Sequence, residues 1–337
     1  MSYRASTLWF TATGALICLS LAIPFLLASS YALHVFADML QLVLLVSGYL
    51  LTVPNQVSYR GRAAAFWTLM SLGFALWILN QALWTFYETV LHQAPTPGFW
   101  GDIVLFLHPI PFMMALAVRP HLAKTQSPGR LNAANAALVL VWWAYLYMYF
   151  VGAWQYISPD TENYNQYFNL VYGAANLGTA ALAALSFLHS RGKWRILYAH
   201  ILGAAFLYVV ASYLASAAID RGVYYSGSMY DVPLVAAMAW FAGIGLVGRE
   251  LRPCAEPSQA NTDTIASWLA LGAIAVVLGV EIRGLFVVVP ASVASFRMLL
   301  SIGTITLLGI LFVLRRNLIR NSGETRVPKG ILDRLGA

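Results

Sequence analysis

Residues 31–53, YALHVFADMLQLVLLVSGYLLTV, decide the fold class of this chain. They include one acidic residue, Asp38, and no lysine or arginine. A helix of about 20 apolar residues is long enough to cross the ~30 Å of hydrocarbon in a bilayer. Similar stretches lie at roughly 7–29, 64–90, 101–119, 133–156, 165–189, 194–220, 229–250, 264–284 and 293–315. The sequence therefore predicts an all-α polytopic membrane bundle of about ten transmembrane helices.

The composition supports a membrane protein without a separate soluble domain. Hydrophobic residues make up 60% of the chain and charged residues only 10%, and the mean hydropathy is +0.69. A soluble domain is about 25% charged, so this chain lacks the charge to cover a surface that faces water. We expect residues 1–316 to form one transmembrane helical bundle and residues 317–337 a short basic cytoplasmic tail.

The basic residues predict the orientation of the helices. Of the 20 lysines and arginines, 17 fall in alternate loops and in the tail, while Arg221, Arg283 and Arg297 lie on the other side. Cytoplasmic loops carry such an excess, so we expect both termini in the cytoplasm. The same rule explains the net charge of +7, and we expect contact with membrane lipid and none with nucleic acid. The first apolar run exceeds a signal-peptide core of roughly 7–15 residues, which favours a retained helix.

Polar side chains inside the predicted helices are the candidate functional groups, because burying them in a bilayer is costly. Trp77, Gln81, Trp84 and Glu88 follow the spacing i, i+4, i+7, i+11 and share one helix face. This face is either interhelical packing or one wall of a ligand pocket. The acids Asp38, Glu88, Asp102, Asp160, Glu162, Asp220, Asp231 and Glu281 all fall in the predicted outer half or on outer loops.

Three other polar patterns occur within predicted helices. His34 and Asp38 are one turn apart and are able to hydrogen-bond on one helix face. Asn169, Tyr172 and Asn176 follow near-helical spacing in a later span. His108-Pro109-Ile110-Pro111 predicts a kinked helix, because each proline removes a backbone donor and frees a carbonyl group.

Motifs of the common enzyme classes do not occur in the sequence. There is no HExxH, no Walker A motif, no GxSxG and no lysine within a predicted span. Haem ligation by His34, His108, His189 or His200 is disfavoured, because two of these histidines are predicted near each side of the membrane. We expect no catalytic residue, no bound metal and no cofactor.

Two stretches resemble a known kind of module. Residues 66–88 (FWTLMSLGFALWILNQALWTFYE), Pro95-Thr96-Pro97, Asp102 and residues 107–112 (LHPIPF) resemble the W…G…LW…Q/D…W…E…P-x-P…D…L…P pattern of multi-span amino-terminal sensor modules in bacterial GGDEF/EAL proteins and histidine kinases. Residues 220–234 (DRGVYYSGSMYDVPL) are similar to the D…Y…G…D…W motif late in the same modules. This chain has Leu234 or Val235 where tryptophan is common, and we expect no output domain within these 337 residues.

The resemblance implies a signal-input or ligand-sensing bundle in a bacterial cytoplasmic (inner) membrane, which acts through a separate kinase or cyclase partner. It assigns the motif acids to Glu88, Asp102, Asp220 and Asp231. Together with Trp77, Gln81, Trp84 and Tyr224, these residues form the predicted outward-facing acidic and aromatic pocket. Two alternatives stay open, an accessory structural subunit of a larger membrane complex and a secondary transporter.

Overall fold

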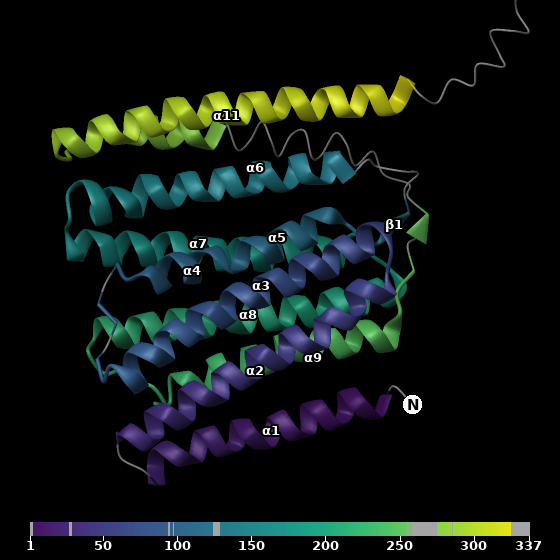
Figure 1. Ribbon diagram of the computed structural model, residues 1–337, viewed down its shortest axis with the longest axis vertical. Coiled ribbons are helices and arrows are strands. Elements are labelled where there is room, and N and C mark those ends of the chain that lie inside the picture. Colours follow the sequence, from purple (N-terminus) through teal and green to yellow (C-terminus); the bar gives the residue numbers. More distant parts are fainter. Residues whose placement is uncertain are drawn as a thin grey trace, which may run out of the picture. The chain divides into compact units, whose positions relative to one another are not determined.

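The computed structural model describes residues 3–26, 29–93, 95–96, 98–123, 129–254, 256–257, 275–284 and 286–324 (Figure 1). The sequence predicts one bundle over residues 1–316, and contacts divide this range into two compact units. Unit 1 comprises Met1–Leu122 and Thr161–Glu256, and unit 2 comprises Ala123–Asp160 and Pro257–Ala337. Each unit is described by itself.

The prediction of an all-α membrane fold is confirmed. Unit 1 contains α1 (Tyr3–Leu26), α2 (Tyr31–Ser58), α3 (Gly61–Thr85), the π-helix η1 (Phe86–Val90), α4 (Trp100–Leu107), α5 (Pro109–Val118), α7 (Thr161–Leu188), α8 (Gly192–Asp220) and α9 (Asp231–Leu251). Unit 2 contains α6 (Gly129–Tyr147), the π-helix η2 (Met148–Ile157) and α11 (Ala291–Glu324), and residues 275–284 are also helical. The two-residue strands β1 (Leu122–Ala123) and β2 (Glu256–Pro257) form a small sheet.

The predicted spans agree closely with these helices. Nine helices within the described ranges are long and apolar enough to cross a membrane. The tenth predicted stretch, 264–284, lies outside the described residues up to residue 274. Helix α11 continues to Glu324, so residues 317–324 of the predicted tail belong to this helix.

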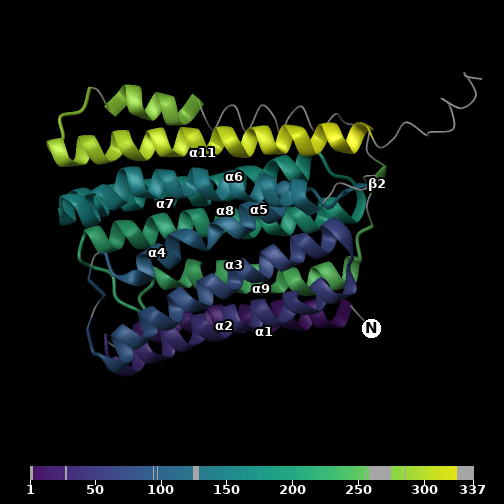
Figure 2. The ribbon, with the colours of Figure 1, turned by 45° about the horizontal axis from the view of Figure 1, so that its top comes forward.

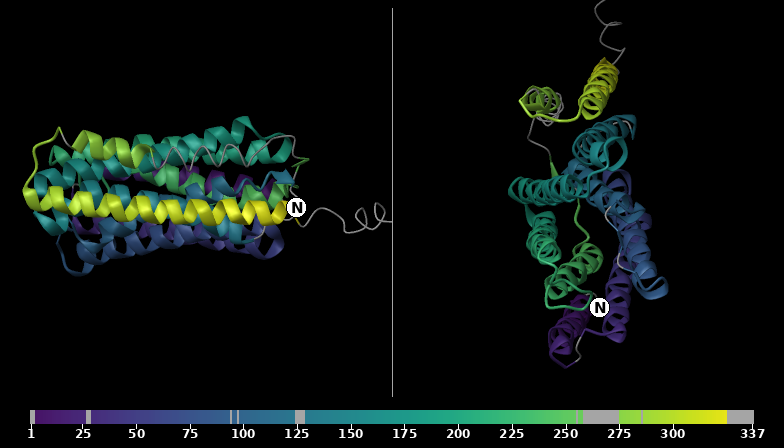
Figure 3. Two further views of the ribbon diagram at one scale, coloured as in Figure 1. Left: turned by 90° about the horizontal axis from the view of Figure 1, so that it is seen from above. Right: turned by 90° about the vertical axis from the view of Figure 1, so that its left-hand side faces the viewer.

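The helices of unit 1 form a closed ring. In order, α2, α3, the α4–α5 pair, α7, α8 and α9 each pack against the next, and α9 packs against α2. Figure 3 (right) shows these helices end-on. Helix α1 lies outside the ring against α9, and Figure 2 shows it beside α2 and α9. Its Trp9 Nε1 donates to the carbonyl oxygen of Ala239 at 2.9 Å.

Aromatic side chains fill the middle of this ring. The ring of Trp77 stacks on that of His108 with centroids 4.7 Å apart and meets the ring of Tyr208 edge-on at the same distance. The hydroxyl groups of Tyr172 and Tyr208 are 2.6 Å apart. His108 Nδ1 is 2.6 Å from the carbonyl oxygen of Leu105, which has no helical donor because the residue four positions later is a proline. The Nδ1 atom therefore carries the proton.

Helices α2 and α9 approach each other at backbone distance. A Cβ atom on Gly245 would lie 2.6 Å from the carbonyl carbon and oxygen of Leu51, so only glycine fits here without movement. Asn55 Nδ2 donates to the carbonyl oxygen of Gly245 at 2.9 Å. Pro54 deprives the Leu50 carbonyl of its helical donor, and Arg249 Nη2 reaches the carbonyl oxygens of Leu51 at 2.8 Å and of Leu50 at 3.4 Å.

A buried histidine follows the end of α5. His121 is 2% exposed, and its Nδ1 is 2.9 Å from the hydroxyl oxygen of Tyr198. Burial, and after it the positive charges of Arg119, His189 and Arg62, lower the pKa of His121 to about 4. The imidazole is therefore neutral at physiological pH.

Candidate functional site

The most unusual polar group in unit 1 is the side chain of Asp38 on α2. It is 1% exposed. Within the described part of the chain, neither of its carboxyl oxygens has a hydrogen-bond partner. Buried polar groups are nearly always hydrogen-bonded, and a buried acid in a membrane helix is a functional candidate by default. Asp38 therefore calls for an explanation other than packing.

Two more acids face Asp38 from neighbouring elements. Glu88 lies in η1, and Asp231 is the first residue of α9. Both interact electrostatically with Asp38, and the Glu88 carboxyl is its near neighbour. The Oε2 atom of Glu88 is buried and, over the described ranges, has no hydrogen-bond partner. We call Asp38, Glu88 and Asp231 the acidic cluster.

The π-helix η1 places Glu88 in this cluster. The backbone N–H of Leu91 donates to the carbonyl oxygen of Phe86 at 3.2 Å, a five-residue spacing that widens the last turns after α3. The wider turn changes the direction of each later side chain relative to a regular helix. Short π-helical turns occur frequently at functional sites, which agrees with the position of Glu88.

Asp231, in contrast, is fully hydrogen-bonded. Its Oδ1 accepts from the hydroxyl group of Tyr224 at 2.8 Å, and its Oδ2 accepts from the backbone N–H of Gly227 at 2.6 Å. Gly227 has a φ of +88°, and a Cβ there would lie 2.7 Å from Leu33 Cγ. Burial and the negative charges of Asp231, Glu88 and Asp38 raise the pKa of Tyr224 well above its ordinary value, so this hydroxyl stays a donor.

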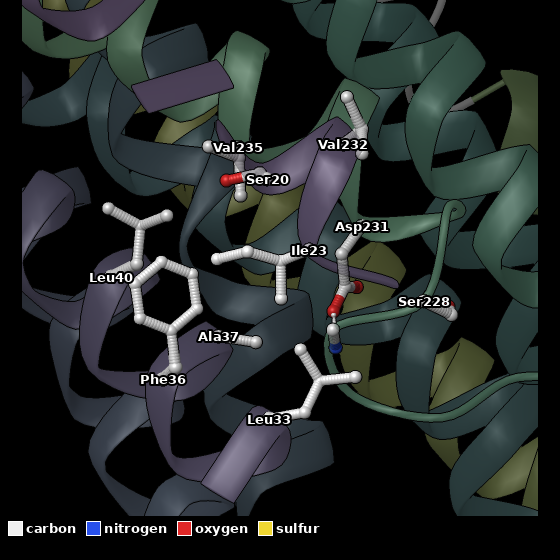
Figure 4. A pocket seen from close by; sticks show the side chains of 11 residues that line it. Ser20, Ile23, Leu33, Phe36, Ala37, Leu40, Ser228, Asp231, Val232 and Val235 are labelled. Atoms are coloured by element: carbon white, nitrogen blue, oxygen red, sulfur yellow. Dashed lines mark hydrogen bonds between the residues drawn. The ribbon is translucent and has the colours of Figure 1, made fainter. Parts of the chain in front are cut away.

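A small pocket adjoins the acidic cluster between α1, α2 and α9. It has room for about one water molecule. Figure 4 shows Asp231 at its edge, with Ile23 of α1 and Leu33 and Ala37 of α2 around it. The other lining side chains are also mainly apolar, namely Ser20, Phe36, Leu40, Ser228, Val232 and Val235.

The structure brings together only some of the residues that the sequence predicts for the pocket. Glu88, Tyr224 and Asp231 meet, and Trp84 Nε1 donates to Ser226 Oγ in the same loop at 3.5 Å. Trp77 and Gln81 are buried in the ring of unit 1, at 1% and 5% exposure. Trp77 contacts aromatic side chains of the core.

Two predicted acids lie apart from the cluster. Asp102 Oδ2 accepts from the Gly98 backbone at 2.9 Å and from the hydroxyl group of Tyr164 at 2.6 Å, which ties the start of α4 to α7. Asp220 is exposed at the end of α8. Of the four motif acids, Glu88 and Asp231 belong to the acidic cluster. Asp102 connects two helices, and Asp220 faces outward.

The predicted hydrogen bond between His34 and Asp38 does not form. His34 Nε2 is 3.3 Å from Ser29 Oγ, and its ring lies 6.1 Å from that of Tyr225. Asp38 points instead into the ring of unit 1. Asp38, Gln41, Leu45, Gly48, Thr52 and Asn55 are all buried and follow alternating spacings of three and four residues. This stripe is the signal that identifies Asp38 as inward-facing.

Comparison with known proteins adds no relative. No family model matches this chain, and neither a curated protein nor a solved structure matches it. The fold itself defines a class, that of multi-span α-helical membrane proteins. The described residues hold no group of three His, Cys, Asp or Glu side chains placed to bind a metal ion.

Proposed function

We propose that this chain is a non-catalytic sensory or ligand-binding module of a bacterial cytoplasmic membrane, which passes its state to a separate protein partner in that membrane. The observation that carries the proposal is Asp38, which is buried beside two other acids and hydrogen-bonds to no described residue. A buried polar group without a hydrogen-bond partner destabilises a protein by about 1–3 kcal/mol. A residue with that cost is more readily explained by function than by stability.

The ligand that suits the acidic cluster carries positive charge. Both carboxyl oxygens of Asp231 are already occupied, whereas Asp38 and Glu88 have oxygens that no described residue contacts. These two acids are available to a proton or to one small organic ammonium group. Either one reduces the repulsion among the three carboxyl groups. The predicted orientation places the cluster toward the outside, where it would meet an external signal.

The α2–α9 pair gives this signal a mechanical route through unit 1. Asp38 and Asp231 belong to these two helices, which hold each other farther along at Gly245 and Leu51. Close backbone packing transmits small displacements, because it leaves no space for one helix to move alone. A shift of charge at the cluster would thus change the α2–α9 geometry at the other end, where Tyr59 donates to the Gly248 carbonyl oxygen at 3.0 Å.

Thermal unfolding of the purified full-length chain in lipid nanodiscs tests this proposal. We expect the melting temperature to rise with added methylammonium or ethylammonium, or with falling pH above the range in which His121 titrates, and the rise to disappear in Asp38→Asn. The matched control is Asp220→Asn, which makes the same chemical change at an exposed position. An equal response in wild type and Asp38→Asn would refute the assignment of the cluster as the ligand site.

A partner search tests the second half of the proposal. The protein is purified from its native membrane in gentle detergent, and copurifying proteins are identified by mass spectrometry. A kinase or cyclase supports the sensor. A large stoichiometric assembly would replace it with the accessory-subunit alternative.

One observation favours a secondary transporter as the second candidate. The α4–α5 helix is interrupted at His108, in the middle of unit 1, where the side chain stacks on Trp77. Interrupted membrane helices are typical of transporter substrate sites. Substrate-dependent proton uptake in sealed vesicles, absent in His108→Gln, would favour transport over sensing.

A further inference from the structure

A second buried charge lies in unit 2, on α11. Arg297 is 6% exposed, and its Nε donates to the carbonyl oxygen of Tyr149 in η2 at 2.9 Å. Its guanidinium carbon lies 4.7 Å from the ring centroid of Tyr149 and 5.8 Å from that of Trp154. These contacts fix the guanidinium plane through one hydrogen bond and two aromatic faces.

One nitrogen of this fixed guanidinium group is not used. Arg297 Nη2 is buried and has no hydrogen-bond partner among the residues that the structure describes. An arginine presents its donors in a rigid fork that matches the oxygens of a phosphate or a carboxylate. The unused nitrogen therefore indicates an acceptor that the chain itself does not supply.

An acid lies near the hydroxyl group of the same tyrosine. Glu281 Oε1 is buried and likewise hydrogen-bonds to no described residue. The Tyr149 hydroxyl and Glu281 Oε2 lie 2.5 and 3.9 Å from the position that a Cβ on Gly284 would take. Both Glu281 and Arg297 act electrostatically on Tyr145. An unused donor and an unused acceptor thus flank one aromatic cluster.

The surface next to these groups is apolar. On α11, Met298, Leu299 and Ile302 are 55%, 67% and 58% exposed. In the turn before α11, Phe286 and Val288 are 83% and 101% exposed. Exposed side chains of this kind suit the acyl chains of a lipid whose headgroup reaches the polar atoms.

We propose that unit 2 binds a phosphoethanolamine group, with Arg297 holding the phosphate and Glu281 holding the primary ammonium. The group has both the acceptor that Arg297 needs and the N–H donors that Glu281 needs. A phosphocholine group has the phosphate but no N–H donor, and a phosphoglycerol group has no cation. The site is independent of the acidic cluster and of the function proposed for it.

Native mass spectrometry of the full-length protein tests this site. Protein is reconstituted into vesicles of equal parts phosphatidylethanolamine, phosphatidylglycerol and phosphatidylcholine, then released in gentle detergent, and the retained lipids are counted. We expect preferential retention of phosphatidylethanolamine, and about a tenfold loss of it in Arg297→Gln, because a charge-assisted hydrogen bond is removed. Arg283→Gln is the matched control, since it removes the same charge at an exposed position on the same helical segment as Glu281.

A second variant separates the two halves of the site. Glu281→Gln should keep the phosphate contact and lose the preference for ethanolamine over glycerol, which a general loss of folding would not produce. Equal retention of the three lipids by the wild type, or unchanged preference in both variants, would overturn the proposal. If water-soluble glycerophosphoethanolamine at equal concentration displaces the lipid, the site binds the phosphoethanolamine group of a soluble molecule. If it does not displace the lipid, the ligand is phosphatidylethanolamine itself.

Discussion

The acidic cluster makes a prediction in which two isosteric substitutions have opposite effects on stability. Asp38→Asn replaces a buried carboxyl group that no described residue hydrogen-bonds. The new amide can donate to the unpaired Oε2 of Glu88 and is not repelled by Glu88 or Asp231. We expect the free energy of unfolding to rise by about 1–3 kcal/mol, the size of one new hydrogen bond together with the relieved repulsion. The variant should therefore be more stable than the wild type and lose its response to the ligand.

Asp231→Asn should act in the reverse direction. The wild-type carboxylate accepts two hydrogen bonds, from Tyr224 at 2.8 Å and from Gly227 at 2.6 Å. An amide keeps one acceptor and turns an N–H group toward one of the two donors. Losing one hydrogen bond to a charged group lowers the free energy of unfolding by about 2–3 kcal/mol. The two variants should therefore differ by about 3–6 kcal/mol.

Equilibrium unfolding in mixed micelles, followed by circular dichroism at fixed pH, measures both values. Asp220→Asn provides the reference, with an expected change within about 0.5 kcal/mol because its side chain is exposed. Destabilisation of Asp38→Asn by more than the reference would refute the reasoning, since it would show that the carboxyl group has a stabilising partner. Equal losses in Asp38→Asn and Asp231→Asn would refute it as well.

Three further predictions concern packing and charge in unit 1. Gly245→Ala should destabilise by about 1–3 kcal/mol through overpacking, whereas Gly173→Ala, with nothing within 4 Å, should be neutral or slightly stabilising in the same unfolding assay. Gly227→Ala should also destabilise and abolish the response to the ligand, because it forces a side chain at a φ of +88°. The pKa of His121 is lowered to about 4 in the folded state, whereas an unfolded histidine has a pKa of about 6.5. The neutral side chain therefore contributes fully to the free energy of unfolding above about pH 6.5, and this contribution is lost as the pH falls toward 4. Melting curves across this range should show a smaller loss of stability in His121→Gln, and an identical loss would refute the assignment.

Most of the fold follows from the sequence because membrane spans are defined by length and apolarity, which are local properties. The bounds of α2 illustrate this, since a predicted span at 31–53 becomes a helix at Tyr31–Ser58. The division into two units was not predictable in the same way. It depends on which helices pack together, and apolar composition does not encode that partner choice.

The candidate site was predicted only in part, for a physical reason. Glu88, Tyr224 and Asp231 could be selected because they match motifs that resemble those of sensor modules. Asp102 and Asp220 have the same property, and only the tertiary contacts separate an acid that joins helices from an exposed one. The π-helical turn of η1 was also not predicted, because it arises from packing rather than from residue type.

Helix α1 has a consequence for how the protein is made. Its Ser6 hydroxyl donates to Glu250 Oε2 at 2.7 Å, a contact between residues 244 positions apart in the chain. At about 5–20 residues per second, a ribosome needs roughly 10–50 s to make the intervening segment. During that time α1 is already synthesised while the surface of α9 that receives it does not yet exist. The segment that leaves the ribosome early is therefore among the last to reach its final position, and it must be held by lipid or by an insertion factor until then.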